Sequence, residues 1–146
     1  MGCKSMVIAA SGDGILVSDK EQSAQIKPYV DKLAGQAMYA EKSWGSFTVL
    51  DVQDDSMTIK VELLPGHSLH YHSHEHRDEV WTVMSGMGSV IIDGMQRMVR
   101  PGDVVTMPAG CKHTLIAETK VSVIEVQLGK DINVDDKKKF DLDIKE

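Results

Sequence analysis

The sequence predicts an all-β barrel or sandwich, preceded by a short N-terminal hairpin and helix. Short apolar or alternating runs recur through residues 44–129. Turn signals rich in Gly, Pro and Asp separate these runs at intervals of roughly eight to twelve residues. A hydrophobic fraction of 42% and a charged fraction of 26% are ordinary for a globular domain and argue against disorder. A chain of 146 residues therefore suits one barrel domain with at most a short extension.

Residues 1–40 are expected to form the hairpin and the helix. Two short apolar runs flank a Ser-Gly-Asp-Gly turn at 11–14, which is typical of a hairpin. Asp19 is a suitable helix cap, apolar residues follow it at helical spacing, and Gly35 is a suitable stop. Pro28 is expected to kink or split this helix.

Residues 41–146 are expected to form the barrel with a charged C-terminal tail. Strands are expected over 46–52, 58–63, 80–84, 89–92, 95–99, 104–107, 113–117 and 121–126. The Asp93-Gly94 pair predicts a two-residue hairpin turn. The tail, 130–146, is rich in Asp and Lys, and we expect a solvated last turn or a frayed end there.

Charge and cysteine content exclude several classes of function. The chain has 16 Lys and Arg against 22 Asp and Glu, a formal net charge of −6, which argues against nucleic acid or an anionic membrane as the main partner. Two cysteines make no disulfide framework, and no apolar run approaches the length of a membrane span. With no signal-peptide pattern, these features predict a cytoplasmic protein.

Histidines cluster where a metal site would need them. Five of the six lie between residues 67 and 76. His72 and His74 are two apart, so in an extended chain they point to the same face and can bind one ion. Glu79 adds a carboxylate, and His113 can reach the site from another strand. The alternative is a set of solvent-facing polar residues on an edge strand.

The spacing of these residues resembles the two sequence motifs of the cupin superfamily. The matching positions are Gly66, His72, His74, Glu79 and Gly86 in the first motif, and Gly102, Pro108, Gly110 and His113 in the second. Only the last position of the second motif departs, because Ala117 stands where the superfamily has Asn. The resemblance implies a double-stranded β-helix, or jelly-roll barrel, that binds a metal.

The same resemblance implies the ligands and the cofactor. The four ligands would be His72, His74, Glu79 and His113, with one divalent ion per chain. Zinc is our first choice, and manganese, iron and nickel are alternatives that this donor set does not distinguish. His70 and His76 are expected beside the ligands rather than among them, and His67 at the surface. Cys111 is expected to be a small buried residue rather than a thiolate ligand.

A narrower resemblance covers about residues 40–141. Segments 43–50, 59–61, 76–81 and 125–129 resemble the isomerase domain of type II phosphomannose isomerases, and the tail from Asp135 to Phe140 fits the same pattern. Those domains are commonly fused to a mannose-1-phosphate guanylyltransferase. Residues 14–20 and the following helix resemble the end of that transferase, so 1–40 is interpreted as a remnant of the junction. The chain is then either a piece of a bifunctional protein or a stand-alone cupin.

The narrower resemblance implies conversion of mannose 6-phosphate to fructose 6-phosphate. This reaction needs a metal to stabilise negative charge, a base for a carbon-bound proton, and a cation for the phosphate. The catalytic candidates are Arg77, Glu125 and His76, and the substrate-binding candidates are Arg77, Lys60, Lys112 and Gln127. A structural ion pair is the alternative for Arg77, and a hydrogen-bond anchor the alternative for Glu125.

Two departures from that family keep a second function open. His72 stands where Gln is usual, and Thr114 stands where Arg is usual. They favour a non-catalytic metal-binding cupin that binds a sugar or sugar nucleotide, or that regulates an associated mannose-1-phosphate guanylyltransferase. A cupin dioxygenase is a third and weaker hypothesis. The expected partners are a small sugar phosphate and, from the family, a second copy in a homodimer.

Overall fold

The computed structural model describes residues 6–11, 14–19 and 38–142, in two compact units, Met1–Ala40 and Glu41–Glu146. In the first unit, β1 (Met6–Ser11) and β2 (Gly14–Asp19) pair in antiparallel register, from Met6 opposite Asp19 to Ser11 opposite Gly14. The predicted N-terminal hairpin is therefore confirmed. The predicted helix lies outside the described residues.

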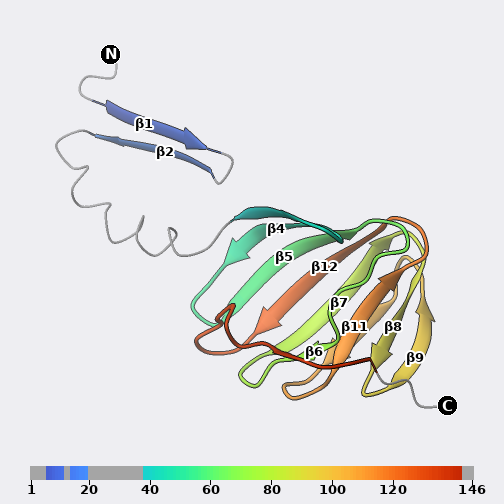
Figure 1. Ribbon diagram of the computed structural model, residues 1–146. Coiled ribbons are helices and arrows are strands. Elements are labelled where there is room, and N and C mark those ends of the chain that lie inside the picture. Colours follow the sequence, from blue (N-terminus) through green and yellow to red (C-terminus); the bar gives the residue numbers. More distant parts are fainter. Residues whose placement is uncertain (1–5, 12–13, 20–37, 143–146) are drawn as a thin grey trace. The chain divides into compact units, whose positions relative to one another are not determined.

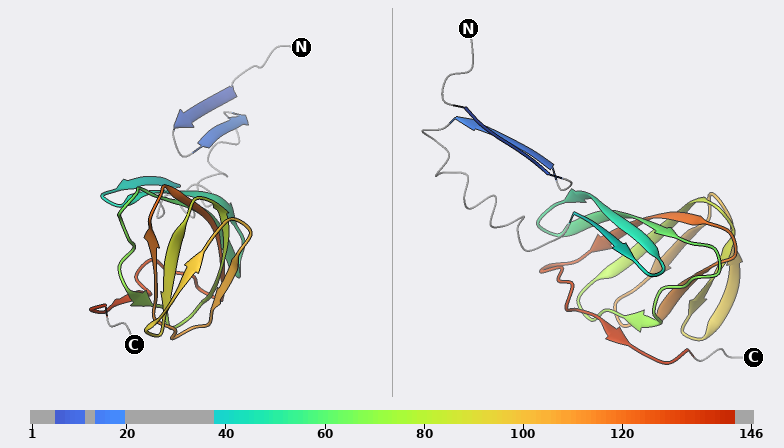
Figure 2. Two further views of the ribbon diagram at one scale, coloured as in Figure 1. Left: turned by 90° about the vertical axis from the view of Figure 1, so that its right-hand side faces the viewer. Right: turned by 45° about the horizontal axis from the view of Figure 1, so that its top comes forward.

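Two antiparallel sheets are built from residues 39–139 (Figures 1 and 2). The six-stranded sheet has the order β10-β7-β12-β5-β4-β3, with β3 at Tyr39–Lys42, β4 at Gly45–Val52, β5 at Ser56–Leu63, β7 at Asp78–Ser85, β10 at Val104–Met107 and β12 at Val121–Leu128. The five-stranded sheet has the order β13-β6-β11-β8-β9, with β6 at His72–Ser73, β8 at Gly88–Ile92, β9 at Met95–Val99, β11 at His113–Ala117 and β13 at Lys138–Lys139. The expected all-β barrel is confirmed, and the described ranges contain no helix that could span a membrane.

Local patterns account for most of the strand bounds. The bounds of β9, β10 and β11 agree with the expected ranges. Between β8 and β9, Asp93 and Gly94 have φ values of 48° and 84°, as a two-residue hairpin turn of the expected kind requires. Strands β3, β6 and β13 were not expected, because they are only two to four residues long and show no apolar alternation.

The core lies between the sheets and is made by alternate residues of each strand. In β7, Glu79, Trp81 and Val83 are buried, while the residues between them are less so. In β11, His113 shares the inward side with Leu115 and Ala117, which belong to the core cluster. The alternation that builds the core therefore also carries Glu79 and His113 inward, at the ends of their strands.

The C-terminal segment, residues 130–142, is held by main-chain contacts. Strand β13 pairs with β6, and the Asp136 carboxylate accepts hydrogen bonds from the backbone N–H groups of Glu75 and His76, both at 2.9 Å. Figure 1 shows this segment running alongside β6. The expected frayed end is therefore wrong for these residues, although most of their side chains are exposed. Most of the charged side chains that suggested fraying are exposed, while strand pairing and the Asp136 carboxylate hold the segment in place.

Candidate metal centre

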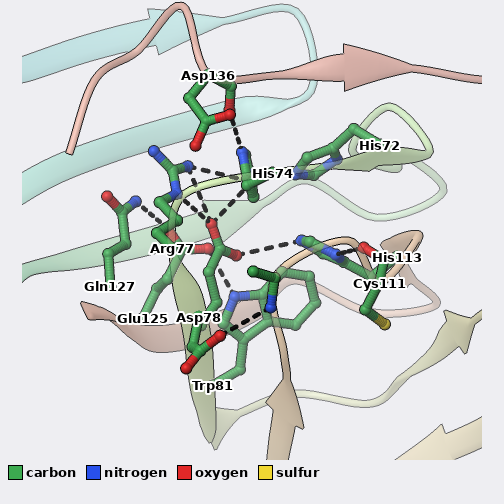
Figure 3. Close-up of polar contacts among 12 residues, drawn as sticks. His72, His74, Arg77, Asp78, Trp81, Cys111, His113, Glu125, Gln127 and Asp136 are labelled. Carbon is green, nitrogen blue, oxygen red and sulfur yellow. Dashed lines mark hydrogen bonds and ion pairs between the residues drawn. The ribbon is translucent and has the colours of Figure 1, made fainter. Parts of the chain in front are cut away.

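Four buried side chains converge at one end of the barrel. His72 comes from β6, His74 follows it, Glu79 lies near the start of β7, and His113 begins β11. One ligand atom from each lies within 4.8 Å of the others. His72 and His113 are direct partners across the β6–β11 pair, whereas β7 belongs to the other sheet. We call these four residues the His–Glu cluster (Figure 3).

Backbone carbonyls set the orientation of all three imidazole rings. Each Nδ1 makes a hydrogen bond to a carbonyl oxygen, and the carbonyls belong to His70, Asp136 and Cys111 for His72, His74 and His113, respectively. A carbonyl can only accept, so each Nδ1 carries the hydrogen. In the neutral ring, Nε2 then presents its lone pair, and this is the form in which histidine binds a metal.

Glu79 completes the donor set. Its Oε1 lies 2.9 Å from Nε2 of His74, and its Oε2 lies 3.2 Å from Nε2 of His113. Burial acts to raise the pKa of Glu79, but its contacts with His113 and His74 hold it well below the usual range. Burial lowers the pKa of His72 to about 3, so that ring is neutral. One charged carboxylate therefore lies opposite three ring nitrogens that can bind a metal.

The donor set fits a divalent cation. An ion bound at about 2.0–2.2 Å places its donor atoms roughly 3.0–4.4 Å apart, close to the separations within the His–Glu cluster. Three imidazoles and one carboxylate suit zinc, manganese, iron or nickel, and the arrangement does not select among them. On an ion that takes six ligands, such as manganese, iron or nickel, the four side chains would leave two coordination positions open, as a catalytic site needs, whereas they would fill a tetrahedral zinc.

Arg77 turns its guanidinium toward the His–Glu cluster. Its Nη2 lies 2.9 Å from Glu79 Oε1 and 3.1 Å from His74 Nε2, and its Nε donates to the same carboxylate oxygen at 3.0 Å. Its Nη1 donates to the carbonyl of Asn133 at 3.4 Å. Arg77 therefore contacts two of the atoms that would bind a metal, and it makes the ion pair that was the alternative to a phosphate contact.

Glu125 is buried near the cluster, between two hydrogen-bond donors. Trp81 Nε1 and Gln127 Nε2 each donate to one of its oxygens at 2.6 Å (Figure 3). Burial, followed by the charge of Glu79, raises the pKa of Glu125 to about 8. Gln127 faces the same interior, and its Oε1 is one of two buried side-chain polar atoms in the described residues without a hydrogen-bond partner. Glu125 can hold or release a proton near neutral pH, and Gln127 can accept a hydrogen bond from a ligand.

Three predicted site residues lie away from the cluster. The His76 side chain is 70% exposed, with its Nε2 3.9 Å from Glu75. Lys60 pairs with Glu62 at 3.0 Å, on the face of β5 opposite the core residue Val61. Lys112 places its ammonium 4.2 Å from the centroid of the Phe140 ring. Roles for these three in catalysis or substrate binding stay predictions.

Two further positions bear on the expected site. Thr114 follows His113 and faces the opposite side of β11, where its hydroxyl donates to the Leu69 carbonyl at 2.7 Å. An arginine at this position would therefore start from the outer face of the sheet. Cys111 packs in the core cluster, and burial raises the pKa of its thiol to about 11. A protonated thiol is a poor metal ligand, in agreement with the expectation of a small buried residue.

Sequence reasoning missed the part played by the C-terminal segment. Asp136 supplies the carbonyl that orients His74, and Lys137 lies close enough to Glu125, Glu79 and Arg77 for their charges to act on its pKa. The likeness of the tail to the isomerase family was the one signal that pointed to a role here. A charge-rich composition, taken alone, indicated solvent exposure.

Comparison with known proteins agrees with this architecture. A family model described as mannose-6-phosphate isomerase C-terminal matches residues 31–142. The mannose-1-phosphate guanylyltransferase of Escherichia coli strain K12 is 26% identical over 149 residues, which cover 96% of this chain and 31% of that protein. The enzyme of the same name from Klebsiella pneumoniae is 27% identical over 146 residues, covering 93% and 31%. The chain thus spans about a third of the length of these curated relatives.

Solved structures show the same fold. An RmlC-like cupin from Shewanella frigidimarina superposes with a TM-score of 0.56 at 20% identity, covering 62% of this chain and 83% of that one. A protein with a double-stranded β-helix domain from Klebsiella pneumoniae superposes with a TM-score of 0.58 at 20% identity, covering 64% and 82%. At this identity the likeness shows the cupin fold alone.

Proposed function

Because the chain belongs to the mannose-6-phosphate isomerase C-terminal family, we propose that its barrel is a metal-dependent isomerase that interconverts mannose 6-phosphate and fructose 6-phosphate. The observation that carries the proposal is the position of Glu125. A buried carboxyl with a pKa of about 8 lies near a His–Glu cluster whose donors suit a divalent ion. A proton-transferring group and a site for a Lewis acid are the two parts that aldose–ketose isomerisation needs.

The reaction moves one hydrogen between two neighbouring carbons. A base removes the proton from C2, the electrons form a C1–C2 double bond, and the electron pair of the C1 carbonyl moves to O1, which gains a proton. O2 then loses its proton as the carbonyl forms at C2, and the carbon-bound proton returns at C1. A divalent ion in the His–Glu cluster would act as a Lewis acid for the negative charge that develops on the oxygens. The chain must supply the group that takes the proton and returns it.

Glu125 is the best placed group for that proton transfer. Its pKa of about 8 lies near neutral pH, so its protonated and ionised forms are both accessible during turnover. The hydrogen bonds from Trp81 and Gln127 keep the carboxyl in one orientation. His76, the other predicted base, is exposed and pairs with Glu75. We therefore assign the proton transfer to Glu125.

Gln127 is the chain's best candidate for contact with a sugar hydroxyl. Its side chain is buried, its amide donates to Glu125, and its Oε1 has no partner. A buried acceptor without a donor is unfavourable by about 1–3 kcal/mol, so a hydroxyl that supplies the hydrogen would be stabilised there. This contact would place the substrate next to Glu125.

A non-catalytic role is the second candidate. It would make the barrel a sugar or sugar-nucleotide binder, or a regulator of a mannose-1-phosphate guanylyltransferase. The observation in its favour is Arg77, which is held by Glu79 and His74 rather than turned outward to a phosphate. The departure at Thr114 argues less strongly for it, because that residue points away from the His–Glu cluster.

A coupled assay distinguishes the two candidates. Protein reconstituted with zinc, and separately with manganese, is supplied with mannose 6-phosphate while fructose 6-phosphate formation is followed and bound metal is measured in the same sample. Turnover that a chelator abolishes supports the isomerase. About one bound ion per chain without turnover under any of the tested metals supports the binding role.

Variants test whether the metal binds to the His–Glu cluster. The double variant His72→Ala with His74→Ala should lose most of its bound metal, because it removes two of four donors. His67→Ala is the matched control, since His67 is exposed, lies outside the His–Glu cluster, and has its ring against the Pro65 carbonyl. Full metal content in the double variant would contradict the assignment of the ligands.

A further inference from the structure

The C-terminal segment lies against the His–Glu cluster through its backbone. Asp136 accepts the hydrogen bond of the His74 ring through its carbonyl, and Arg77 donates to the carbonyl of Asn133. In the β13–β6 pair, Lys139 is opposite His72 and Lys138 is opposite Ser73. Residues that follow the barrel in the sequence therefore form part of the wall beside the cluster.

The register of this pair determines which lysines face the cluster. Directly opposed residues of an antiparallel pair have their side chains on the same side of the sheet, so Lys139 shares the side of His72. Lys137 lies just before this two-residue strand and directly after Asp136, whose carbonyl contacts the His74 ring. Lys138 is on the other side, where its ammonium lies 5.4 Å from the Phe140 ring and Phe140 packs edge-on against Tyr71.

Charges around Lys137 agree with this placement. Burial lowers the pKa of Lys137, and the charges of Lys139 and Arg77 lower it further. The carboxyl groups of Glu125 and Glu79 act to raise it. The ammonium of Lys137 is therefore within electrostatic range of the cluster, and it remains partly open to solvent.

Positive charge gathers at this place in an acidic chain. Arg77, Lys137 and Lys139 bring three cations near the carboxyl groups of Glu79, Glu125 and Asp136. The chain as a whole carries a net charge of −6, so this local gathering of cations does not follow from composition. A bound divalent ion would add positive charge here, which an anionic group of a ligand can neutralise.

We propose that Lys137 and Lys139 of the C-terminal segment bind the phosphate of the ligand whose sugar end reaches the His–Glu cluster. This inference rests on the proposed function for the identity of the ligand as a sugar phosphate, but not for the placement of the lysines. It assigns the phosphate contact to two residues outside the motif region. Lysine ammonium groups are suited to this role because they bind phosphate as point charges and can follow a mobile group.

The test compares two lysine positions that face the cluster with one that does not. Binding of mannose 6-phosphate, mannose and inorganic phosphate to the zinc-reconstituted full chain is measured by titration calorimetry. The double variant Lys137→Met with Lys139→Met should weaken mannose 6-phosphate binding at least tenfold and leave mannose binding within twofold. Lys138→Met, the matched control, should change neither by more than twofold.

Further arms separate the inference from the proposed function. The arginine variants, Lys137→Arg with Lys139→Arg, keep both charges and should retain mannose 6-phosphate binding within threefold. If the wild-type chain binds inorganic phosphate but not mannose 6-phosphate, and the double Met variant loses phosphate, the sugar assignment fails and the lysine assignment stands. Equal losses in the double variant and in Lys138→Met, equal losses for mannose and mannose 6-phosphate, or no binding of either phosphate compound by the wild-type chain would each overturn the lysine assignment.

Discussion

Replacing Glu125 by glutamine tests the acid–base environment of the site through stability alone. The wild-type carboxyl has a pKa of about 8 in the folded chain against an ordinary value of 4.5. Between these two pH values the folded state holds a proton that the unfolded state has released. The contribution of this proton to the free energy of unfolding is therefore fully present below pH 4.5. It is lost as the pH rises toward 8, by about 1.4 kcal/mol per pH unit and about 5 kcal/mol over the whole interval.

Glutamine keeps the shape of the side chain but cannot ionise. At position 125 its carbonyl can accept a hydrogen bond from Trp81. When the Gln127 amide rotates by about 180°, the new amide can donate to Gln127 Oε1, the atom that lacks a partner in the wild-type chain. We therefore expect Glu125→Gln to have nearly wild-type stability at pH 5 and to be more stable by several kcal/mol at pH 8.

Urea unfolding of both proteins from pH 5 to 8.5, with a chelator present throughout, measures this difference. Subtracting the two curves cancels the contribution of His72, whose lowered pKa makes stability fall in the acid direction, below its ordinary value of 6.5, in both proteins. The difference between the free energies of unfolding of Glu125→Gln and wild type should rise by about 1.4 kcal/mol per pH unit. Two parallel curves would show that Glu125 is ionised in the folded state, and the reasoning for its proton-transfer role would fail with it.

Three further predictions concern packing, the tryptophan donor and metal loading. Gly86→Ala should lower the free energy of unfolding by more than about 3 kcal/mol, because the added Cβ would lie 2.0 Å from the Lys120 carbonyl oxygen, whereas Gly110→Ala, with the same φ of 84° and no atom within 4 Å, should lose only about 1 kcal/mol in urea unfolding. Equal losses would contradict the close-approach argument. Trp81→Phe should cost about 1–3 kcal/mol beyond its lost packing, because Oε1 of Glu125 loses its donor, and the same unfolding assay combined with Glu125→Gln checks whether the two effects are coupled. Zinc at a hundred times its dissociation constant should stabilise the wild-type chain by about 2.7 kcal/mol, seen as a higher thermal midpoint, and the His72→Ala, His74→Ala variant should show no such rise.

The features that were predictable from the sequence are those encoded within a few residues. The turn at Asp93-Gly94 and the ends of the neighbouring strands follow from local signals, and the structure agrees with them. The alternation of apolar residues along β5 also predicts the direction of Lys60. Ile59, Val61 and Leu63 occupy the inner face of β5, so the intervening Lys60 had to point outward, away from the site. Its selection as a substrate-binding residue considered its charge and not its place in this alternation, and that role stays a prediction.

The missed features depend on pairing across long sequence distances. Lys137 faces the His–Glu cluster because β13 pairs with β6, more than sixty residues earlier, and neither strand exceeds two residues. So short a pair has no periodicity that a sequence pattern could reveal. Arg77 lies beside the His–Glu cluster, and its choice of partner, a phosphate or Glu79, depends on side-chain geometry that the sequence does not carry.

The contact between Asp136 and His74 shows why the motif alone does not define this centre. The motif supplies the imidazole, yet the hydrogen bond that places the lone pair on Nε2 ends at a main-chain carbonyl in the C-terminal segment. Every residue carries such a carbonyl, so no side-chain pattern can indicate which one is used. The Asp136 carboxylate meanwhile binds the N–H groups of Glu75 and His76, which holds its own carbonyl against the ring. The same segment thus orients a metal ligand with its backbone and presents Lys137 and Lys139 with its side chains, so that formation of the metal site and of the proposed phosphate contact depends on one docking event.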